Sequence, residues 1–177
     1  MNIRQFEKDD FFAISDIYSK SKLDELRFEK KKFELVPLEN DKKRLSELKE
    51  SDIYVYEDRD ILGYTALFRS EIRALFVCPG SRGQGIGKCL LEFLLSKVTG
   101  SVSLYVAKSN APAKNFYTRY GFKIVEEFQT TYNGSNVLAN KMVRLSTMAN
   151  KRINADRFYT PRRFTLLCVK PSGYAKR

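Results

Sequence analysis

The chain has 177 residues, of which 43% are apolar and 30% charged, a balance typical of a folded protein that excludes global disorder. It contains no histidine, which excludes nucleophilic systems built on a Ser-His or Cys-His pair and leaves acid–base chemistry to carboxylates, tyrosine, cysteine, lysine or water. None of its three cysteines lies in a C-x-x-C motif, so we expect no zinc site or other metal.

Two further absences bear on location. No run of about eighteen apolar residues occurs, so we expect no membrane span. The first residues, Met1–Phe6, lack the apolar centre of a signal peptide, which predicts a cytoplasmic protein.

The net charge of +11 is unevenly distributed. Residues 146–177 carry eight basic side chains and one acidic one, which accounts for +7 and leaves +4 for residues 1–145. We therefore predict one domain, 1–145, followed by a basic C-terminal extension, 146–177. The extension would dock as a strand on the domain or on a second subunit in a homodimer, bind RNA or DNA as a basic arm, or be an appended segment with no role. We favour the last interpretation.

The first half of the chain predicts a strand, two helices and three further strands. The helices would follow the acidic pair Asp9-Asp10 and the break at Pro37, and the turn Asp58-Arg59-Asp60 indicates a hairpin. The strands are expected at residues 2–6, 52–57, 61–69 and 71–77, and the second helix at 38–48.

A glycine-rich turn follows the fourth of these strands. Gly83, Gly85 and Gly87 alternate with Arg82, Gln84 and Ile86, and a helical stripe of apolar residues four apart begins at once. Glycine allows close approach of a ligand to the backbone, and the first amides of a helix have no partners within it. The turn therefore predicts a phosphate socket, to which Arg82 and Lys88 add charge.

The second half predicts a strand, a helix and a hairpin. Alternation favours a strand over 102–107, and Asn110-Ala111-Pro112 is typical of a helix start. Gly121 would end that helix, and Asn133-Gly134 indicates a tight turn between strands at 122–132 and 136–145. The whole order is βααβββαβαββ, an α/β fold with a mixed sheet.

Two of these segments resemble signatures of one family. The run Val77-x-Pro79-x-x-Arg82-Gly83-x-Gly85-Ile86-Gly87 resembles the acyl-CoA pyrophosphate loop of the GNAT superfamily of N-acetyltransferases, and Asn110-x-x-Ala113-x-x-Phe116-Tyr117-x-x-x-Gly121-Phe122 resembles its second signature. The resemblance implies a mostly antiparallel central sheet flanked by helices. Dinucleotide-binding and P-loop motifs fit less well, because the third glycine comes one place early and Cys89 replaces Ser or Thr after Gly87-Lys88.

The resemblance also implies a binding site for acetyl-CoA as co-substrate. Phe76 and Val77 would offer backbone hydrogen bonds to pantetheine lying between two splayed strands, and Asn110 would contact it from the other side or serve only as a helix cap. The pyrophosphate would lie on Arg82, Gly83, Gln84, Gly85, Ile86, Gly87 and Lys88.

Two residues are candidates for the chemistry. By resemblance, the Tyr117 hydroxyl would protonate the departing thiolate, although Tyr117 also fits the apolar stripe of its helix. Glu71, six residues before Val77 and expected on the same strand face, is at a position that resembles the one where several family members carry a general base. The alternative is that Glu71 forms a surface pair with Arg73 and that ordered water takes the proton.

These residues predict an enzyme that transfers an acetyl group from acetyl-CoA to a primary amine of a small molecule by direct attack. The alternatives are acetylation of a macromolecule, either a protein amine or an aminoacyl-tRNA, and a catalytically silent acyl-CoA-binding or nucleic-acid-binding module. By resemblance, the acceptor pocket would involve residues 20–37 and 129–136.

Overall fold

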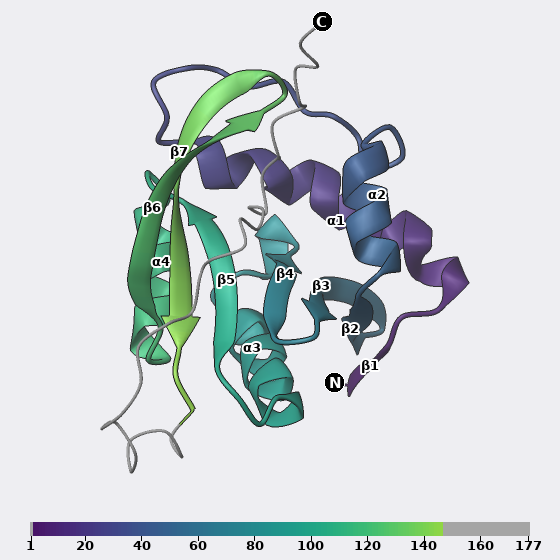
Figure 1. The fold of residues 1–177 in the computed structure, drawn as a ribbon. Helices are drawn as coiled ribbons and strands as arrows, with labels where there is room; N and C mark the ends of the chain where they lie inside the picture. The colour runs from purple at the N-terminus through teal and green to yellow at the C-terminus, as the bar shows by residue number, and fades with distance from the viewer. Residues whose placement is uncertain (1, 147–177) are drawn as a thin grey trace, which may run out of the picture.

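The computed structural model describes residues 2–146 (Figure 1). The predicted extension, residues 146–177, therefore lies outside the described residues except for Ser146. The elements in chain order, with η for a 3-10 helix, are β1 (Asn2–Gln5), η1 (Lys8–Asp10), α1 (Phe11–Ser21), η2 (Lys22–Leu26), α2 (Lys42–Lys49), β2 (Asp52–Asp58), β3 (Asp60–Phe68), β4 (Glu71–Val77), η3 (Pro79–Ser81), α3 (Ile86–Lys97), β5 (Val102–Ala107), α4 (Ala111–Arg119), β6 (Lys123–Tyr132) and β7 (Ser135–Arg144).

The seven strands form one sheet in the order β1-β2-β3-β4-β5-β7-β6. Every neighbouring pair is antiparallel except β4 and β5, which run parallel. The predicted α/β class and mostly antiparallel sheet are thus confirmed. The β6–β7 turn has positive φ at both Asn133 and Gly134, as the Asn-Gly pair predicts.

Helices cover both faces of the sheet, and an apolar core lies under each pair. On one face, α1 and α2 pack through Ile14, Tyr18 and Leu48 against β2, β3 and β4. On the other, α3 and α4 pack through Leu91, Leu94 and Tyr117 against β4, β5 and β7. The second helix begins later than predicted because Asp41 caps it, accepting a hydrogen bond from the Arg44 amide at 2.9 Å.

A bulge in β4 changes which residues share a face. Ala66 of β3 is paired with Ala74 and Leu67 with Ile72, so Arg73 is an extra residue without a partner opposite. Ile72 and Val77 consequently both pack toward α3, whereas Ala74 and Phe76 pack toward α1. Glu71 alternates with Ile72 and lies on the α1 side. The expectation that Glu71 and Val77 share a face is therefore wrong, because strict alternation does not survive a bulge.

Candidate active site

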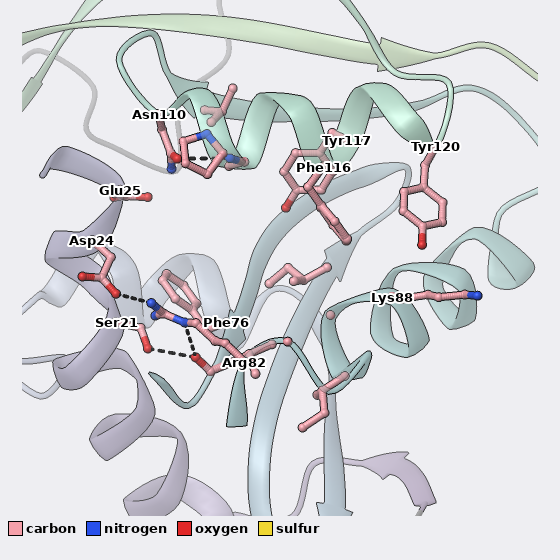
Figure 2. Close-up of a pocket in the computed structure, with 18 of the residues that line it drawn as sticks. Ser21, Asp24, Glu25, Phe76, Arg82, Lys88, Asn110, Phe116, Tyr117 and Tyr120 are labelled. Carbon is pink, nitrogen blue, oxygen red and sulfur yellow. Dashed lines mark hydrogen bonds and ion pairs between the residues drawn. The ribbon is translucent and has the colours of Figure 1, made fainter. Parts of the chain in front are cut away.

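A cleft of about 970 Å³ opens between the ends of β4 and β5. The loop after β4 and the start of α3 form one side, η2 the second and α4 the third (Figure 2). Most of the predicted site residues line it: Phe76, Val77, Arg82, Gly83, Gly85, Ile86, Gly87, Lys88, Asn110 and Tyr117. Gln84 and Glu71 do not.

The cleft exists because β4 and β5 separate. Their parallel pairing is confined to Glu71 with Ser103 and Ile72 with Leu104, at the start of both strands. Further along, Phe76 on one strand and Tyr105 on the other line the cleft. An extended chain such as pantetheine would fit between two such strand edges, because their backbone groups point into the gap.

The loop after β4 presents backbone amides at the cleft. Gly83 and Gly85 have φ of 79° and 86°, and Gly85 is the N-cap of α3. The helical hydrogen bonds begin with the Cys89 amide, which donates to the Gly85 carbonyl at 3.0 Å. The amides of Ile86, Gly87 and Lys88 precede this bond and point out of the helix end. This end of a twelve-residue helix suits a phosphate group.

Arg82 links this loop to η2 across the cleft. Its Nε donates to the Val77 carbonyl at 3.3 Å, and its Nη1 lies 2.5 Å from Asp24 Oδ2 (Figure 2). The Ser21 hydroxyl also donates to the Val77 carbonyl, at 3.2 Å. A pyrophosphate on Arg82 would therefore share the guanidinium with Asp24 or displace it. The Val77 carbonyl, one of the backbone groups that could bind pantetheine, already accepts two hydrogen bonds.

Helix α4 forms the opposite wall. The Asn110 side chain accepts a hydrogen bond from the Ala113 amide at 3.2 Å, which confirms its predicted role as a helix cap. Asn110 also lines the cleft, so its cap position places it where cofactor contact was expected. Further along the helix, the aromatic rings of Phe116, Tyr117 and Tyr120 face the same space.

Tyr117 both packs in the apolar core and presents its hydroxyl to the cleft, so it fits the two roles that its sequence position left open, core residue and proton donor. Its ring packs edge-on against Phe116 and Phe122, and the residue is 7% exposed. Its hydroxyl points into the cleft (Figure 2). Burial raises the pKa of Tyr117 well above its ordinary value, and the negative charge of Glu25 raises it further. The phenol is therefore protonated at neutral pH, as a proton donor must be.

Glu71 lies behind the cleft rather than in its wall. Its Oε1 is 3.5 Å from Arg73 Nε, and Arg73 also pairs at 3.0 Å with Glu50, the residue that follows α2. Burial raises the pKa of the Glu71 carboxyl above its usual value, and the Arg73 guanidinium offsets part of that rise. Burial also raises the pKa of Tyr105 to about 12, with Glu71 as a further cause. Tyr105 does line the cleft, whereas Glu71 does not.

Three cleft residues carried no specific signal in the sequence. Glu25 was one of several charges in the 20–37 segment, and Tyr105 was one of the alternating residues of a strand. Tyr120 was part of an apolar stripe. All three line the cleft, and the 3-10 turn η2 that positions Glu25 was not predicted.

Comparison with known proteins agrees with this architecture. A family model for the acetyltransferase (GNAT) domain matches residues 49–124. The peptidyl-lysine N-acetyltransferase YjaB of Salmonella typhimurium is 36% identical over 72 residues, which is 41% of this chain and 49% of that protein. The streptothricin acetyltransferase of Streptomyces lavendulae is 32% identical over 93 residues, 47% of this chain and 49% of that protein.

Solved structures share the fold over more of the chain. A GCN5-related N-acetyltransferase from Rhodopseudomonas palustris superimposes with a TM-score of 0.67 at 14% identity, over 81% of this chain and 94% of that one. The yncA protein of Salmonella typhimurium, solved with its cofactor acetyl-CoA, gives 0.61 at 18% identity over 92% and 98%.

The chain therefore matches the acetyltransferase (GNAT) domain over residues 49–124 and has the fold of the solved N-acetyltransferases on which it superimposes. It spans about half the length of the curated relatives it matches. None of the helices in residues 2–146 is both long enough and apolar enough to cross a membrane.

Proposed function

We propose that this protein is an acyl-CoA-dependent N-acetyltransferase that moves an acetyl group from acetyl-CoA to a primary amine of a small molecule. The observation that carries the proposal is the continuity of the cleft. It joins the amide-lined start of α3, the separated edges of β4 and β5, and the Tyr117 hydroxyl in one cavity. A nucleotide diphosphate, an extended arm and a thioester would need these three surfaces in this order.

The residues present fit such a ligand. The amides of Ile86, Gly87 and Lys88, with the guanidinium of Arg82, supply hydrogen bonds and positive charge for a pyrophosphate. Direct attack requires only that donor and acceptor meet in the cleft in suitable orientation, since holding two reactants together removes much of the entropic barrier.

The reaction needs two proton transfers, one to the departing sulfur and one from the attacking nitrogen. The amine attacks the thioester carbon, the carbon–sulfur bond breaks, and the Tyr117 hydroxyl gives its proton to the departing sulfur. The attacking nitrogen loses its proton to water, either ordered water alone or water that connects to Glu71 behind Tyr105. The Glu71 role requires this indirect path because its carboxylate does not line the cleft.

A protein lysine is a second candidate acceptor. Two similar proteins are named peptidyl-lysine N-acetyltransferases. One is YjaB of Salmonella typhimurium, and the other is YiaC of Escherichia coli, which is 35% identical to this chain over 71 residues. A lysine side chain offers the same primary ammonium on a flexible stem as a small polyamine does. The chemistry in the cleft would be identical, and only contacts outside the cleft would differ.

The test is a direct assay of turnover. The protein would be incubated with acetyl-CoA and a panel of acceptors (spermidine, a lysine derivative, streptothricin, lysine-containing peptides and charged tRNA), and release of free thiol would be followed. We expect turnover with at least one small primary amine. Tight binding of CoA without turnover of any acceptor would overturn the proposal in favour of a silent acyl-CoA-binding module, and turnover of peptides alone would favour the second candidate.

A further inference from the structure

A buried ion pair lies beside the cleft in η2. Lys22 is wholly buried, and its Nζ forms an ion pair with Glu25 Oε1 one turn further on. The ammonium also lies 5.9 Å from the ring centroid of Tyr18 and 5.3 Å from that of Tyr132. A buried ammonium is costly unless a carboxylate compensates it, so the pair fixes where the Glu25 carboxylate sits.

The pair shows only its negative end to the cleft. The Glu25 side chain is 15% exposed and lines the cleft, whereas that of Lys22 is 0% exposed. A carboxylate accepts several hydrogen bonds at once, so the bond from Lys22 does not exhaust its capacity. A molecule in the cleft therefore meets a fixed acceptor group with its counter-charge behind it.

The two other acids of the cleft wall have different surroundings. Asp24 is held by Arg82 at the side of the glycine-rich loop. Glu92 lies on α3, is 51% exposed, and is 4.0 Å from Lys88. Both belong to the side of the cleft where the pyrophosphate is expected, which leaves Glu25 as the acid facing the remaining space.

Glu25 lies across the cleft from Tyr117. The carboxylate projects from η2 toward the wall formed by α4, from which the Tyr117 hydroxyl projects (Figure 2). The influence of Glu25 on the pKa of Tyr117 is consistent with this placement. If Tyr117 marks the sulfur of the thioester, an amine attacking the adjacent carbon from the open side would approach along the Glu25 wall.

We infer that Glu25 is the specificity-determining residue for the acceptor: its carboxylate, fixed by the buried Lys22, binds the ammonium group of a cationic primary amine. The inference rests on the proposed function and names the acceptor class of the same site. Glu25 selects the protonated amine and positions its nitrogen near the thioester carbon. The ammonium then loses one proton to water, and the neutral amine attacks and loses its second proton to water; neither transfer uses Glu25.

The test compares the variant Glu25→Gln with the unchanged protein, using spermidine and Nα-acetyl-lysine amide as cationic acceptors and aniline as one that is uncharged at neutral pH. Glu92→Gln is the matched control, because it removes a carboxylate from the same cleft on the α3 side. A double variant, Lys22→Met with Glu25→Gln, removes both members of the buried ion pair. It still allows cationic and uncharged acceptors to be compared if Glu25→Gln alone prevents folding because the Lys22 ammonium has lost this carboxylate.

We expect Glu25→Gln and the double variant to lower kcat/KM for the cationic acceptors by about tenfold to a hundredfold, mainly through KM, as loss of a charge-assisted hydrogen bond would do. Activity with aniline and affinity for CoA should change less than about threefold, and Glu92→Gln should leave the preference for cations intact.

An active Glu25→Gln variant with an unchanged KM for spermidine, or an equal loss with aniline, would overturn the inference alone. An unchanged protein that binds CoA and acetylates no amine would overturn the proposed function and the inference with it.

Discussion

The proposed cofactor side and the proposed acceptor side of the cleft are built differently. The proposed cofactor side is one continuous segment, residues 75–88, in which strand end, turn and helix start follow each other and the groups proposed to bind are mostly backbone amides. The proposed acceptor side is assembled from η2, β5 and α4, whose residues Glu25, Tyr105 and Tyr117 line the cleft although they are far apart in sequence. Its binding groups are side chains.

The difference explains why many different sequences can form the cofactor side, whereas the acceptor side depends on the individual side chains of one protein. Backbone amides at a helix start bind the same group whatever the neighbouring side chains are, so many sequences can retain that site. A pocket of side chains changes with every substitution on three separate elements. The donor can therefore be inferred from a short stretch, whereas the acceptor requires the packed structure.

The largest effect is expected where the two sides meet, at Tyr117. The variant Tyr117→Phe keeps the buried ring but removes the proton donor, so kcat should fall about a hundredfold while the affinity for CoA stays the same. Tyr120→Phe is the matched control, since Tyr120 lines the same cleft from the same helix wall. Steady-state kinetics with thiol detection would measure both, and full activity of Tyr117→Phe would show that the sulfur is protonated elsewhere.

The next effect concerns the backbone of the cofactor side. Gly85 has φ of 86°, and a side chain there would be strained and would project from the turn that presents the amides. We expect Gly85→Ala to weaken CoA binding about tenfold in a calorimetric titration, with little change in KM for the amine. Gly80→Ala serves as the control, because a Cβ at Gly80 meets nothing within 4 Å and its φ is not in the positive range. Equal effects of the two substitutions would argue against the backbone as the binding element.

Glu71 is expected to make the folding stability depend on pH. Its pKa is raised by burial, so the folded protein binds a proton there more readily than the unfolded chain. The stability from this group is present below the ordinary glutamate pKa of about 4.3 and is lost as pH rises through the raised value. The free energy of unfolding of Glu71→Gln, relative to that of the unchanged protein, should therefore be higher at pH 7 than at pH 4. Chemical denaturation of both proteins at the two pH values would measure it.

The same substitution tests Glu71 as the base. If water passes the amine proton to Glu71, Glu71→Gln should lower kcat at pH 7 about tenfold and remove the acidic limb of the kcat profile. A profile that keeps its acidic limb at the original position would assign the proton to ordered water alone. KM for cationic acceptors should not change, in contrast to the result expected for Glu25→Gln.

The smallest effect concerns the bridge between the two sides. Asp24 and Arg82 are 42% and 40% exposed, and exposed pairs contribute little. Asp24→Asn should free the guanidinium for the pyrophosphate and tighten CoA binding by about threefold. Asp16→Asn is the control, as Asp16 forms a similar exposed pair with Lys20 on α1. Weaker CoA binding by Asp24→Asn would mean that the bridge organises the loop instead of competing with the ligand.

The sequence predicted most of the fold and the cofactor side because their determinants are local. The limits of β4 and β5, the Asn110 cap and the Asn133-Gly134 turn follow from alternation, capping and turn preferences of adjacent residues. The bulge at Arg73 was missed because it depends on how β3 pairs with β4, and it moved Glu71 to another face. Glu25 was not singled out because its position depends on the complete burial of Lys22, three residues before it, and burial of a lysine is not visible in the spacing of residues.

A crystal structure with acetyl-CoA bound would test the central claim most directly. We predict the pyrophosphate on the amides of the Gly83–Lys88 turn, pantetheine between β4 and β5, and the sulfur within hydrogen-bond reach of the Tyr117 hydroxyl, with Glu25 facing the thioester from the other wall. A bound acetyl-CoA whose sulfur lies away from Tyr117, or whose pyrophosphate lies off this turn, would contradict it.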